Sequence, residues 1–253
     1  MVAPTHYKGG NMQKILGYIR RACQEFDLIE DGDRIAVGVS GGKDSLVLLA
    51  GLAHMRRFYE KKYELVAITL DPRFGGEDGD YSAVERLCES LGVEFHLIRT
   101  DIAEIVFDIR KEDSPCSLCA KMRRGALHDA AKQFGCNKIA LGHNNDDAIE
   151  TFMMNLFKEG RIGCFAPISY LSRKDITMIR PLVFAPEYAV QSCARRNNFE
   201  IVKSKCPADK HTTRQTTKEM LAQMEREDKG IKQRIFGALR KSGIDRWGYK
   251  EEQ

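Results

Sequence analysis

The chain has 253 residues, of which 43% are hydrophobic and 30% are charged, and this balance is typical of a soluble globular protein that can bury one sizeable core. No apolar run approaches the roughly 18 residues of a membrane-spanning helix, and the first residues lack the apolar segment of a secretory signal. We therefore expect a cytoplasmic protein without membrane association. Eight cysteines in such a chain argue against a disulfide framework.

The net charge of +4 is unevenly distributed along the chain. Residues 210–250 hold eleven Lys or Arg and five Asp or Glu, a balance of +6, so the remainder carries −2. A basic C-terminal arm on a nearly neutral body indicates a polyanionic partner such as nucleic acid. A solvated helix of mixed charge would give the same composition, so both interpretations stay open.

Hydrophobic periodicity predicts a helix over residues 12–26, followed by strands that alternate with helices. The expected strands are 34–39, 64–70, 93–98, 138–142 and 176–182. The expected helices are 44–57, 81–91, a helix carrying residues 116–119 that runs to about 134, 146–157, 186–197, and one or two more around 220–239. The pattern weakens over 160–174, where we expect an irregular loop or a hairpin.

This alternation of hydrophobic strands with helices predicts an α/β fold, in which a parallel sheet is covered by helices on both faces. We divide the chain into an N-terminal helical segment (1–33), an α/β domain (34–205) and a basic helical C-terminal extension (206–253).

Residues 37–48, VGVSGGKDSLVL, run from the first predicted strand into the next helix. The first N–H groups of a helix lack intrahelical partners and its dipole end is positive, so this junction suits an anion. The glycines let the backbone close on a phosphate, and the serine hydroxyls and Lys43 add donors. Asp44 adds a negative charge, which a Mg²⁺ ion bound with the phosphates would offset. The expected contacts are Ser40, Gly41, Gly42, Lys43, Asp44 and Ser45.

The spacing is neither that of a Walker A loop, G-x-x-x-x-G-K-[ST], nor that of the G-x-G-x-x-G dinucleotide fingerprint. The string S-G-G-x-D-S instead resembles the PP-loop of the ATP pyrophosphatases, a superfamily with an adenine-nucleotide α-hydrolase-like fold. The resemblance implies that the loop grips the β,γ-pyrophosphate of ATP while a substrate oxygen attacks the α-phosphorus. Lys43 and Asp44 are then expected to be catalytic, and Asp71, where the second strand ends, is expected to join the nucleotide contacts.

A second junction between strand and helix follows at 141–157, LGHNNDDAIETFMMNLF. Asp146 and Asp147 fall in the first helical turn, where Asp is also a common cap. Because the carboxyl ends of parallel strands share one edge of the sheet, we expect this junction to face the PP-loop and to serve ATP or a metal. It resembles the G-H-N-x-x-D segment of PP-loop tRNA thiolases, which implies that Gly142 and an aspartate approach ATP. Spacing does not separate the two aspartates as catalytic residues, and His143 is expected to contact the nucleotide or to support the loop.

Cys116 and Cys119 form a C-x-x-C pair on one face of a predicted helix, and Cys206 follows far along the chain. The pair alone is compatible with redox chemistry, with zinc or with no function. With the two loops, the three cysteines resemble the tRNA 2-thiolation enzymes of the TtcA type over roughly residues 12 to 225. That resemblance implies a [4Fe–4S] cluster on Cys116, Cys119 and Cys206, with one iron open to an exogenous sulfur. Zinc is the alternative occupant.

The activity implied is that of an ATP-dependent tRNA sulfurtransferase, which adenylates the C2 carbonyl of a pyrimidine, with cytidine expected, and replaces its oxygen by sulfur. The expected partners are tRNA, a sulfur donor (sulfide or a cysteine desulfurase) and a second copy of the chain in a homodimer. Arg123 and Arg124 are expected either to steer tRNA phosphates or to form a solvated helix face. Two alternatives remain: a PP-loop amidase or ligase that modifies tRNA and carries structural zinc, and a non-catalytic nucleotide-binding redox sensor.

Overall fold

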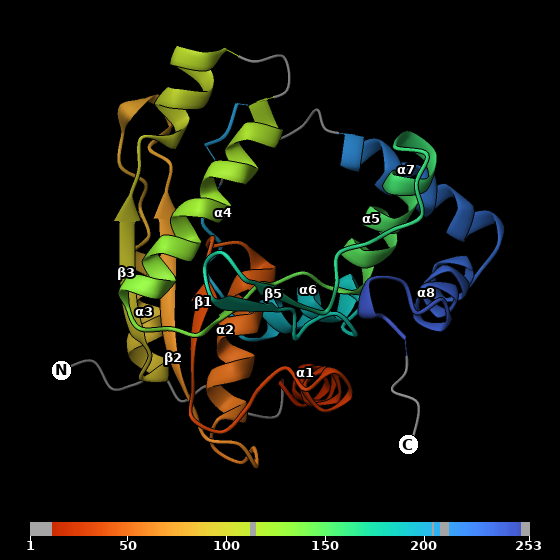
Figure 1. Ribbon diagram of the computed structural model, residues 1–253, viewed down its shortest axis with the longest axis horizontal. Helices are drawn as coiled ribbons and strands as arrows, with labels where there is room; N and C mark the ends of the chain where they lie inside the picture. The colour runs from red at the N-terminus through yellow and green to blue at the C-terminus, as the bar shows by residue number, and fades with distance from the viewer. Residues whose placement is uncertain (1–11, 112–114, 204, 208–212, 249–253) are drawn as a thin grey trace.

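Six strands form the central sheet of the computed structural model, which describes residues 12–111, 115–203, 205–207 and 213–248 (Figure 1). They follow one another in the order β3-β2-β1-β4-β6-β5 across the sheet. The strands are β1 (Asp33–Gly38), β2 (Tyr63–Asp71), β3 (Glu94–Arg99), β4 (Lys138–Ala140), β5 (Ile168–Leu171) and β6 (Ile176–Ile179).

The parallel sheet predicted from the alternating pattern is confirmed for the five strands β1 to β4 and β6. β5 pairs with β6 in antiparallel orientation, so the stretch expected to be an irregular loop or a hairpin forms a hairpin that adds an edge strand. The strand expected at 176–182 ends earlier, at Ile179. Pro181, which lacks an N–H for a ladder, lies in the turn that follows.

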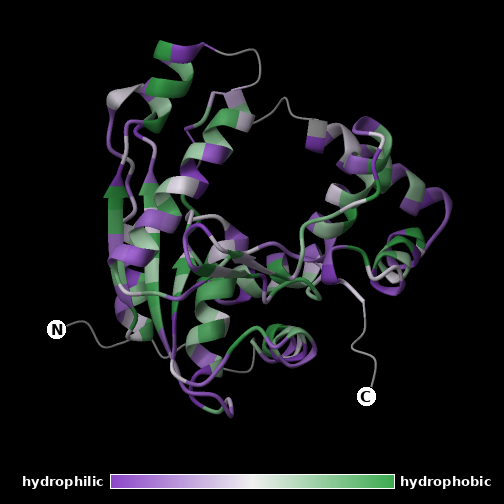
Figure 2. Cartoon of the chain, in the orientation of Figure 1, coloured by the Kyte–Doolittle hydropathy of each residue, from purple (hydrophilic) through white to green (hydrophobic). Residues whose placement is uncertain are grey.

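Helices cover both faces of the sheet, as expected. On one face α1 (Gln13–Phe26), α2 (Lys43–Met55), α3 (Ser82–Leu91) and α6 (Glu187–Arg196) share the largest buried apolar cluster with the sheet. Figure 2 shows α2 as a mostly hydrophobic helix, in keeping with its burial between sheet and neighbouring helices. On the other face α4 (Pro115–Gln133) packs on β2 and β4 over a second apolar cluster.

The remaining long helices gather away from β3, where α5 (Asn145–Lys158) packs against α7 (Thr213–Glu227) and α8 (Ile231–Lys241) (Figure 1). Ile149, Met153 and Leu221 form their small apolar core. Short helical turns complete the described elements: η2 (Phe74–Gly76), η3 (Glu104–Arg110) and η4 (Ile244–Arg246). No helix in the described part of the chain combines the length and the apolar character needed to cross a membrane.

The two outer segments of the predicted division both contact the α/β body. α1 lies so close to α2 that a Cβ on Gly51 would come within 2.4 Å of Ile19 Cδ1. Beyond α8, the buried Trp247 packs edge-on against Phe26 and donates its indole N–H to the Phe165 carbonyl at 2.7 Å. Residues 1–11, 208–212 and 249–253 of these two segments lie outside the described residues, and the domain boundaries stay a prediction.

The strand order reverses direction between β1 and β4, because β2 and β3 follow on one side of β1 while β4 and β6 lie on the other. In open α/β sheets, ligands bind outside the carboxyl ends of the strands at such a switch point. The loops that leave β1 and β4 there are residues 39–42 and 141–144, which are the two motifs found in the sequence.

Candidate active site

The loop between β1 and α2 is held by hydrogen bonds of its own serines, and it leaves the amino end of the helix without a side-chain cap. Gly42 precedes α2 in extended conformation. The Ser45 hydroxyl turns back, donates to the Gly42 carbonyl at 2.9 Å and accepts from the Ser40 N–H at 3.2 Å. The first N–H groups of α2 are therefore presented by a preorganised loop, which is the arrangement that binds phosphate.

Two glycines let other backbone segments lie against this loop. Gly41 has a φ of +80°, and a Cβ there would lie 2.6 Å from the Cβ of Val202. The Val202 N–H donates to the Gly41 carbonyl at 3.0 Å. A Cβ on Gly142 would lie 3.1 Å from the backbone N of Ser45. The loop after β4 and the segment that leads to Cys206 thus both rest on the loop after β1.

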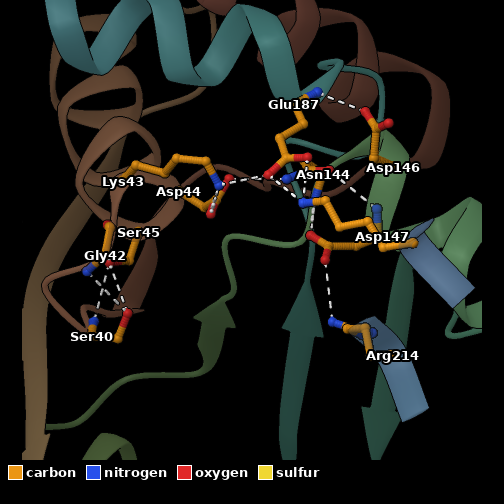
Figure 3. A network of polar contacts seen from close by, with 11 residues as sticks. Ser40, Gly42, Lys43, Asp44, Ser45, Asn144, Asp146, Asp147, Glu187 and Arg214 are labelled. Atoms are coloured by element: carbon orange, nitrogen blue, oxygen red, sulfur yellow. Dashed lines mark hydrogen bonds and ion pairs between the residues drawn. The ribbon is translucent and has the colours of Figure 1, made fainter. Parts of the chain in front are cut away.

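Lys43 and Asp44 are joined in a polar network (Figure 3). Lys43 Nζ donates to Asp44 Oδ2 at 2.8 Å and lies 3.2 Å from Oε1 of Glu187, which in turn accepts from Lys218 of α7. Asp44 Oδ1 accepts from the Asn144 amide at 2.9 Å. Burial opposes the ammonium charge of Lys43, but the two carboxylates outweigh it and raise the pKa of Lys43. Lys43 is therefore positively charged, and it stands at the start of α2, beside the N–H groups available to a phosphate.

Asp147 supports the loop that carries Asn144. Its carboxylate accepts from the Asn144 N–H at 2.9 Å, while the Asn144 side chain accepts from the Asp147 N–H at 3.2 Å, a reciprocal cap of α5. Arg214 of α7 donates to the other carboxylate oxygen of Asp147 at 3.2 Å. Burial, the largest influence, raises the pKa of Asp147 despite these donors.

Asp146 points toward different partners (Figure 3). Oδ2 of Asp146 accepts from the Glu187 N–H at 2.7 Å, and Oδ1 accepts from Lys232 of α8 at 2.9 Å. The structure thus distinguishes the two aspartates, which the spacing did not: Asp147 holds Asn144, which touches Asp44, whereas Asp146 joins α5 to α6 and α8.

A cavity of about 310 Å³ opens beside the loop after β1. Gly38, Ser40, Asp44 and Ser45 contribute one side, and Gly142 and His143 contribute another. Its apolar walls are Val39, Ile68, Leu70, Leu127, Leu141 and Met178. An apolar chamber ending at an uncapped helix matches a nucleotide, because the base fills the apolar part and the phosphates meet the N–H groups. The Asp44 carboxylate in its wall is an oxygen ligand of the kind that Mg²⁺ prefers.

Two histidines in the wall of this cavity carry buried ring nitrogens with no hydrogen-bond partner among the described residues: Nε2 of His128 and Nδ1 of His143. Burial lowers the pKa of His128, and it lowers the pKa of His143 to about 3. Both rings are therefore neutral at pH 7. A buried polar atom left unpaired costs free energy, so a ligand that supplied a partner for either ring nitrogen would be favoured.

Asp71 lies at the same edge of the sheet, but its carboxylate accepts hydrogen bonds from the loop that follows β2. It accepts from the Arg73 N–H at 3.0 Å and from the Gly79 N–H at 2.8 Å. It lines a second cavity, of about 260 Å³, that shares Ser40 and Arg123 with the first. The expected role of Asp71 as a nucleotide contact stays a prediction, and its visible role is to hold the loop after β2.

The thiol of Cys119 is influenced electrostatically by the other two cysteines of the predicted metal site. Cys116 is exposed, and Cys119 and Cys206 are half-buried. Burial raises the pKa of the Cys119 thiol, Arg123 opposes that rise, and the charges of Cys206 and Cys116 add to it. Among the described residues no three Cys, His, Asp or Glu side chains already form a metal-binding group. Three thiols in one electrostatic neighbourhood nevertheless match the chemistry of an iron–sulfur cluster, whose protein ligands are thiolates.

Several polar residues of the site carry no signal that the sequence analysis used. Asn144 stands inside the quoted GHN motif, and its role as a bridge to Asp44 could have been suspected. His128, Glu187, Arg214 and Lys218 stand alone in helices with no motif around them, and their place in the site follows only from the packing of α4, α6 and α7.

The sheet with its switch point, the uncapped glycine loop and the apolar chamber beside it define an α/β nucleotide-binding protein of the PP-loop class. The family model described as the PP-loop domain matches residues 15–225. The chain is 40% identical over 230 residues to a tRNA-cytidine(32) 2-sulfurtransferase of Geobacter sulfurreducens, covering 90% of this chain and 89% of the relative. It is 39% identical over 229 residues to the enzyme of the same name from Citrifermentans bemidjiense, covering 89% of both chains.

Among solved structures, the chain resembles the U34-tRNA thiolase NcsA from Methanococcus maripaludis with its [4Fe-4S] cluster. The TM-score is 0.74 at 26% identity, with 90% of this chain and 76% of that chain covered. The chain belongs to the PP-loop family that contains the tRNA-cytidine(32) 2-sulfurtransferases.

Proposed function

We propose that this protein is an ATP-dependent tRNA sulfurtransferase that replaces the C2 oxygen of a cytidine by sulfur. The relatives named above act on cytidine 32, and we propose the same nucleotide here. ATP and Mg²⁺ are expected to use Ser40, Gly41, Gly42, Lys43, Asp44 and Ser45, with Gly142 and His143 beside them, while Cys116, Cys119 and Cys206 hold the cluster.

The observation that supports this assignment best is the connection between the nucleotide cavity and the cysteines. Arg123 lines the cavity and acts on the pKa of the Cys119 thiol. The segment before Cys206 is tied to the loop after β1 through the Val202–Gly41 hydrogen bond of 3.0 Å. A reaction that needs ATP activation and sulfur chemistry at one carbonyl group requires this proximity.

The first step is adenylation. The cytidine O2 attacks the α-phosphorus, a new P–O bond forms, the bond to the bridging oxygen of the β-phosphate breaks, and pyrophosphate leaves. The N–H groups at the start of α2 and the ammonium of Lys43 stabilise the negative charge that develops on the phosphates. Lys43 must exchange Asp44 or Glu187 for a phosphate oxygen to do so. Asp44, which accepts a hydrogen bond from Asn144 at 2.9 Å, is the residue that we expect to carry Mg²⁺.

The second step replaces the activated oxygen. A sulfur at the oxidation level of sulfide bonds to C2, the C2–O bond breaks, and AMP leaves with the former carbonyl oxygen, so no electrons are gained or lost overall. When bound, a cluster held by three thiolates supplies an open iron position for that sulfur. Arg123, between the cavity and Cys119, offers a positive charge to the departing AMP.

The sulfur donor, either sulfide or a cysteine desulfurase, and the homodimer are part of the proposal. The basic character of residues 210–250 supports tRNA as partner, and of its charges Lys210 and Lys250 lie outside the described residues. In the described part, Arg214, Lys218 and Lys232 are paired with carboxylates of the site. Contacts between tRNA and this region would therefore act on the carboxylates that contact Lys43 and Asn144.

The proposal is tested with the Lys43→Ala variant of anaerobically purified protein. We expect the rate of pyrophosphate release in the presence of ATP and tRNA to fall by at least a hundredfold. This corresponds to the roughly 3 kcal/mol by which such a group typically stabilises the transition state. Iron content and visible absorption should be unchanged, because Lys43 belongs to the nucleotide side. Lys61→Ala, which removes an exposed lysine, is the matched control.

Three results would count against the proposal. Release of pyrophosphate by the wild-type protein in the absence of tRNA would indicate that the adenylated substrate is not RNA. Stoichiometric zinc without iron would favour the ligase. Binding of ATP with no pyrophosphate release under any condition would favour the nucleotide-binding sensor.

A further inference from the structure

The second cavity of the protein adjoins the nucleotide cavity at the loop after β1. The two cavities share Ser40 and Arg123 in their walls, and Gly42 lines the second one as well. The second cavity therefore reaches the loop that is expected to bind the phosphates of ATP.

The same cavity also reaches toward the cysteines. Lys205, which precedes Cys206 in the chain, lines it. Arg123, which also lines it, lies one helical turn beyond Cys119 on α4. The wall of this cavity thus contains residues of the loop after β1, Ser40 and Gly42, and also chain neighbours of Cys119 and Cys206, and the reacting carbonyl has to come near both places.

Two aromatic side chains, Phe74 and Tyr81, belong to the wall. Phe74 packs edge-on against Phe107 of η3, with ring centroids 6.0 Å apart. Tyr81 packs partly buried against the main core, and a Cβ on Gly79 would come within 2.7 Å of its ring. With Asp71 holding the Gly79 N–H, the loop presents fixed aromatic surfaces, on which an unpaired base stacks.

The charged side chains around the second cavity favour a nucleotide whose base lies inside the cavity while its phosphates stay outside. Lys203 and Lys205 line the cavity and are exposed. Lys205 lies 3.1 Å from Glu77, an exposed pair of the kind that contributes little to stability, so an RNA phosphate can replace the carboxylate. The acids Asp71, Glu77 and Asp80, also in the wall, disfavour a phosphate inside it.

We propose that this cavity receives the target cytidine of the tRNA, with its base stacked on Tyr81 and its flanking phosphates paired with Lys203 and Lys205. The inference rests on the proposed function. RNA-modifying enzymes commonly act on bases that leave the stack, and a loop nucleotide can do so at low cost. In this position O2 faces the loop after β1 on one side and the cysteines on the other.

The test uses the holoprotein and an anticodon stem–loop RNA with 5-iodocytidine at the target position. Irradiation should link this nucleotide to a peptide that contains Tyr81 or Phe74, since iodopyrimidines couple to the aromatic ring they contact. A cross-link confined to residues outside the second cavity overturns the inference.

A binding measurement gives an independent readout. With pyrrolocytidine at the target position, the wild-type protein and Tyr81→Phe should quench its fluorescence, whereas Tyr81→Ala should not and should bind roughly tenfold more weakly, since stacking on one aromatic ring contributes about 1–3 kcal/mol. Tyr170→Ala, which removes an exposed tyrosine of β5, is the matched control. Equal quenching and affinity for Tyr81→Ala and the wild type overturn the inference.

These experiments distinguish failure of the proposed function from failure of the proposed cytidine site. If the wild-type protein does not bind the RNA at all, the proposed function fails and the inference with it. If the protein binds and thiolates the RNA while the cross-link maps elsewhere, the proposed function stands and the inference alone is wrong.

Discussion

His128 places a neutral, unpaired ring nitrogen in the wall of the nucleotide cavity. Without ligand this buried polar atom costs about 1–3 kcal/mol. We predict that His128→Leu raises the unfolding temperature of the unliganded protein by about 2–4 °C for each kilocalorie recovered. The same substitution should weaken ATP binding about tenfold, or about 1.4 kcal/mol, because a partner of the adenine nucleotide is lost.

Thermal unfolding with and without a non-hydrolysable ATP analogue measures both effects on one sample. His54→Leu, a substitution of a histidine outside the cavity at the end of α2, is the control and should leave the ligand-induced shift intact. An unchanged shift in His128→Leu would mean that Nε2 has no ligand to bind.

Glu150 predicts a pH dependence of stability. Burial, the largest influence, and the nearby Asp147 raise the pKa of Glu150 from 4.5 to about 7, against the opposing charge of Arg214. Between pH 4.5 and 7 the folded protein keeps a proton that the unfolded chain releases, so this group lowers stability as pH rises, and its effect is complete above pH 7. Glu150→Gln removes the penalty, which is on the order of 3 kcal/mol.

Urea unfolding of Glu150→Gln and wild type from pH 4.5 to 8 tests this sign. The variant should gain stability relative to the wild type as pH rises to 7 and then hold that advantage. Glu89→Gln, at an exposed position, should show a difference that does not vary with pH. A constant difference for Glu150→Gln as well would contradict a raised pKa.

At the scale of elements, the contact between Gly41 and Val202 couples the loop after β1 to the segment that carries Cys206. Gly41→Ala meets both a φ of +80° and a Val202 Cβ only 2.6 Å away. We predict that this substitution reduces ATP binding and iron content together, each by at least several-fold, whereas Lys43→Ala affects only the ATP chemistry.

Gly17→Ala is the matched control, since a Cβ there meets nothing within 4 Å and the residue lies in the interior of α1. Alanine in a helix interior should stabilise the protein by about 0.5–1 kcal/mol and change neither ligand. Normal iron content in a Gly41→Ala protein that no longer binds ATP would show that the two sites are independent.

Some helices and strands are easier to predict from their sequence than others. β1 and α2 were predictable, because a buried strand is followed by glycines and then by a long apolar helix. Over residues 160–174 the sequence does not decide between a loop and a hairpin, since β5 has only four residues and Tyr170 in it is exposed. An edge strand of this kind buries too little to leave a periodic signal.

In the candidate site, too, some features are predictable from the sequence and others are not. The two loops were predictable from local motifs, since a strand-to-helix junction with glycines has few other uses. The distinct partners of Asp146 and Asp147 were not, because Glu187, Lys232 and Arg214 come from three later helices. Only the packing of α6, α7 and α8 on α5 decides which carboxylate reaches which cation.

At the scale of the whole molecule, the α/β fold serves to bring three distant stretches to one edge of the sheet. The switch point between β1 and β4 places the nucleotide loops together. Cys116, Cys119 and Arg123 lie on α4, and the segment that leads from α6 to Cys206 contacts the loop after β1 through Val202. The general topology was predictable from the alternation of strands and helices, whereas the return of this last segment was not, since it is irregular and has no periodicity.

The central claim is that ATP activates the carbonyl oxygen which sulfur then replaces. The most direct measurement uses tRNA labelled with ¹⁸O at C2 of the target cytidine, incubated with the holoprotein, ATP and sulfide, and mass spectrometry of the released nucleotide. We predict one ¹⁸O atom in the phosphate of AMP for each thiocytidine formed and none in pyrophosphate. Label recovered in water, or in inorganic phosphate accompanied by ADP, would contradict adenylation of the carbonyl.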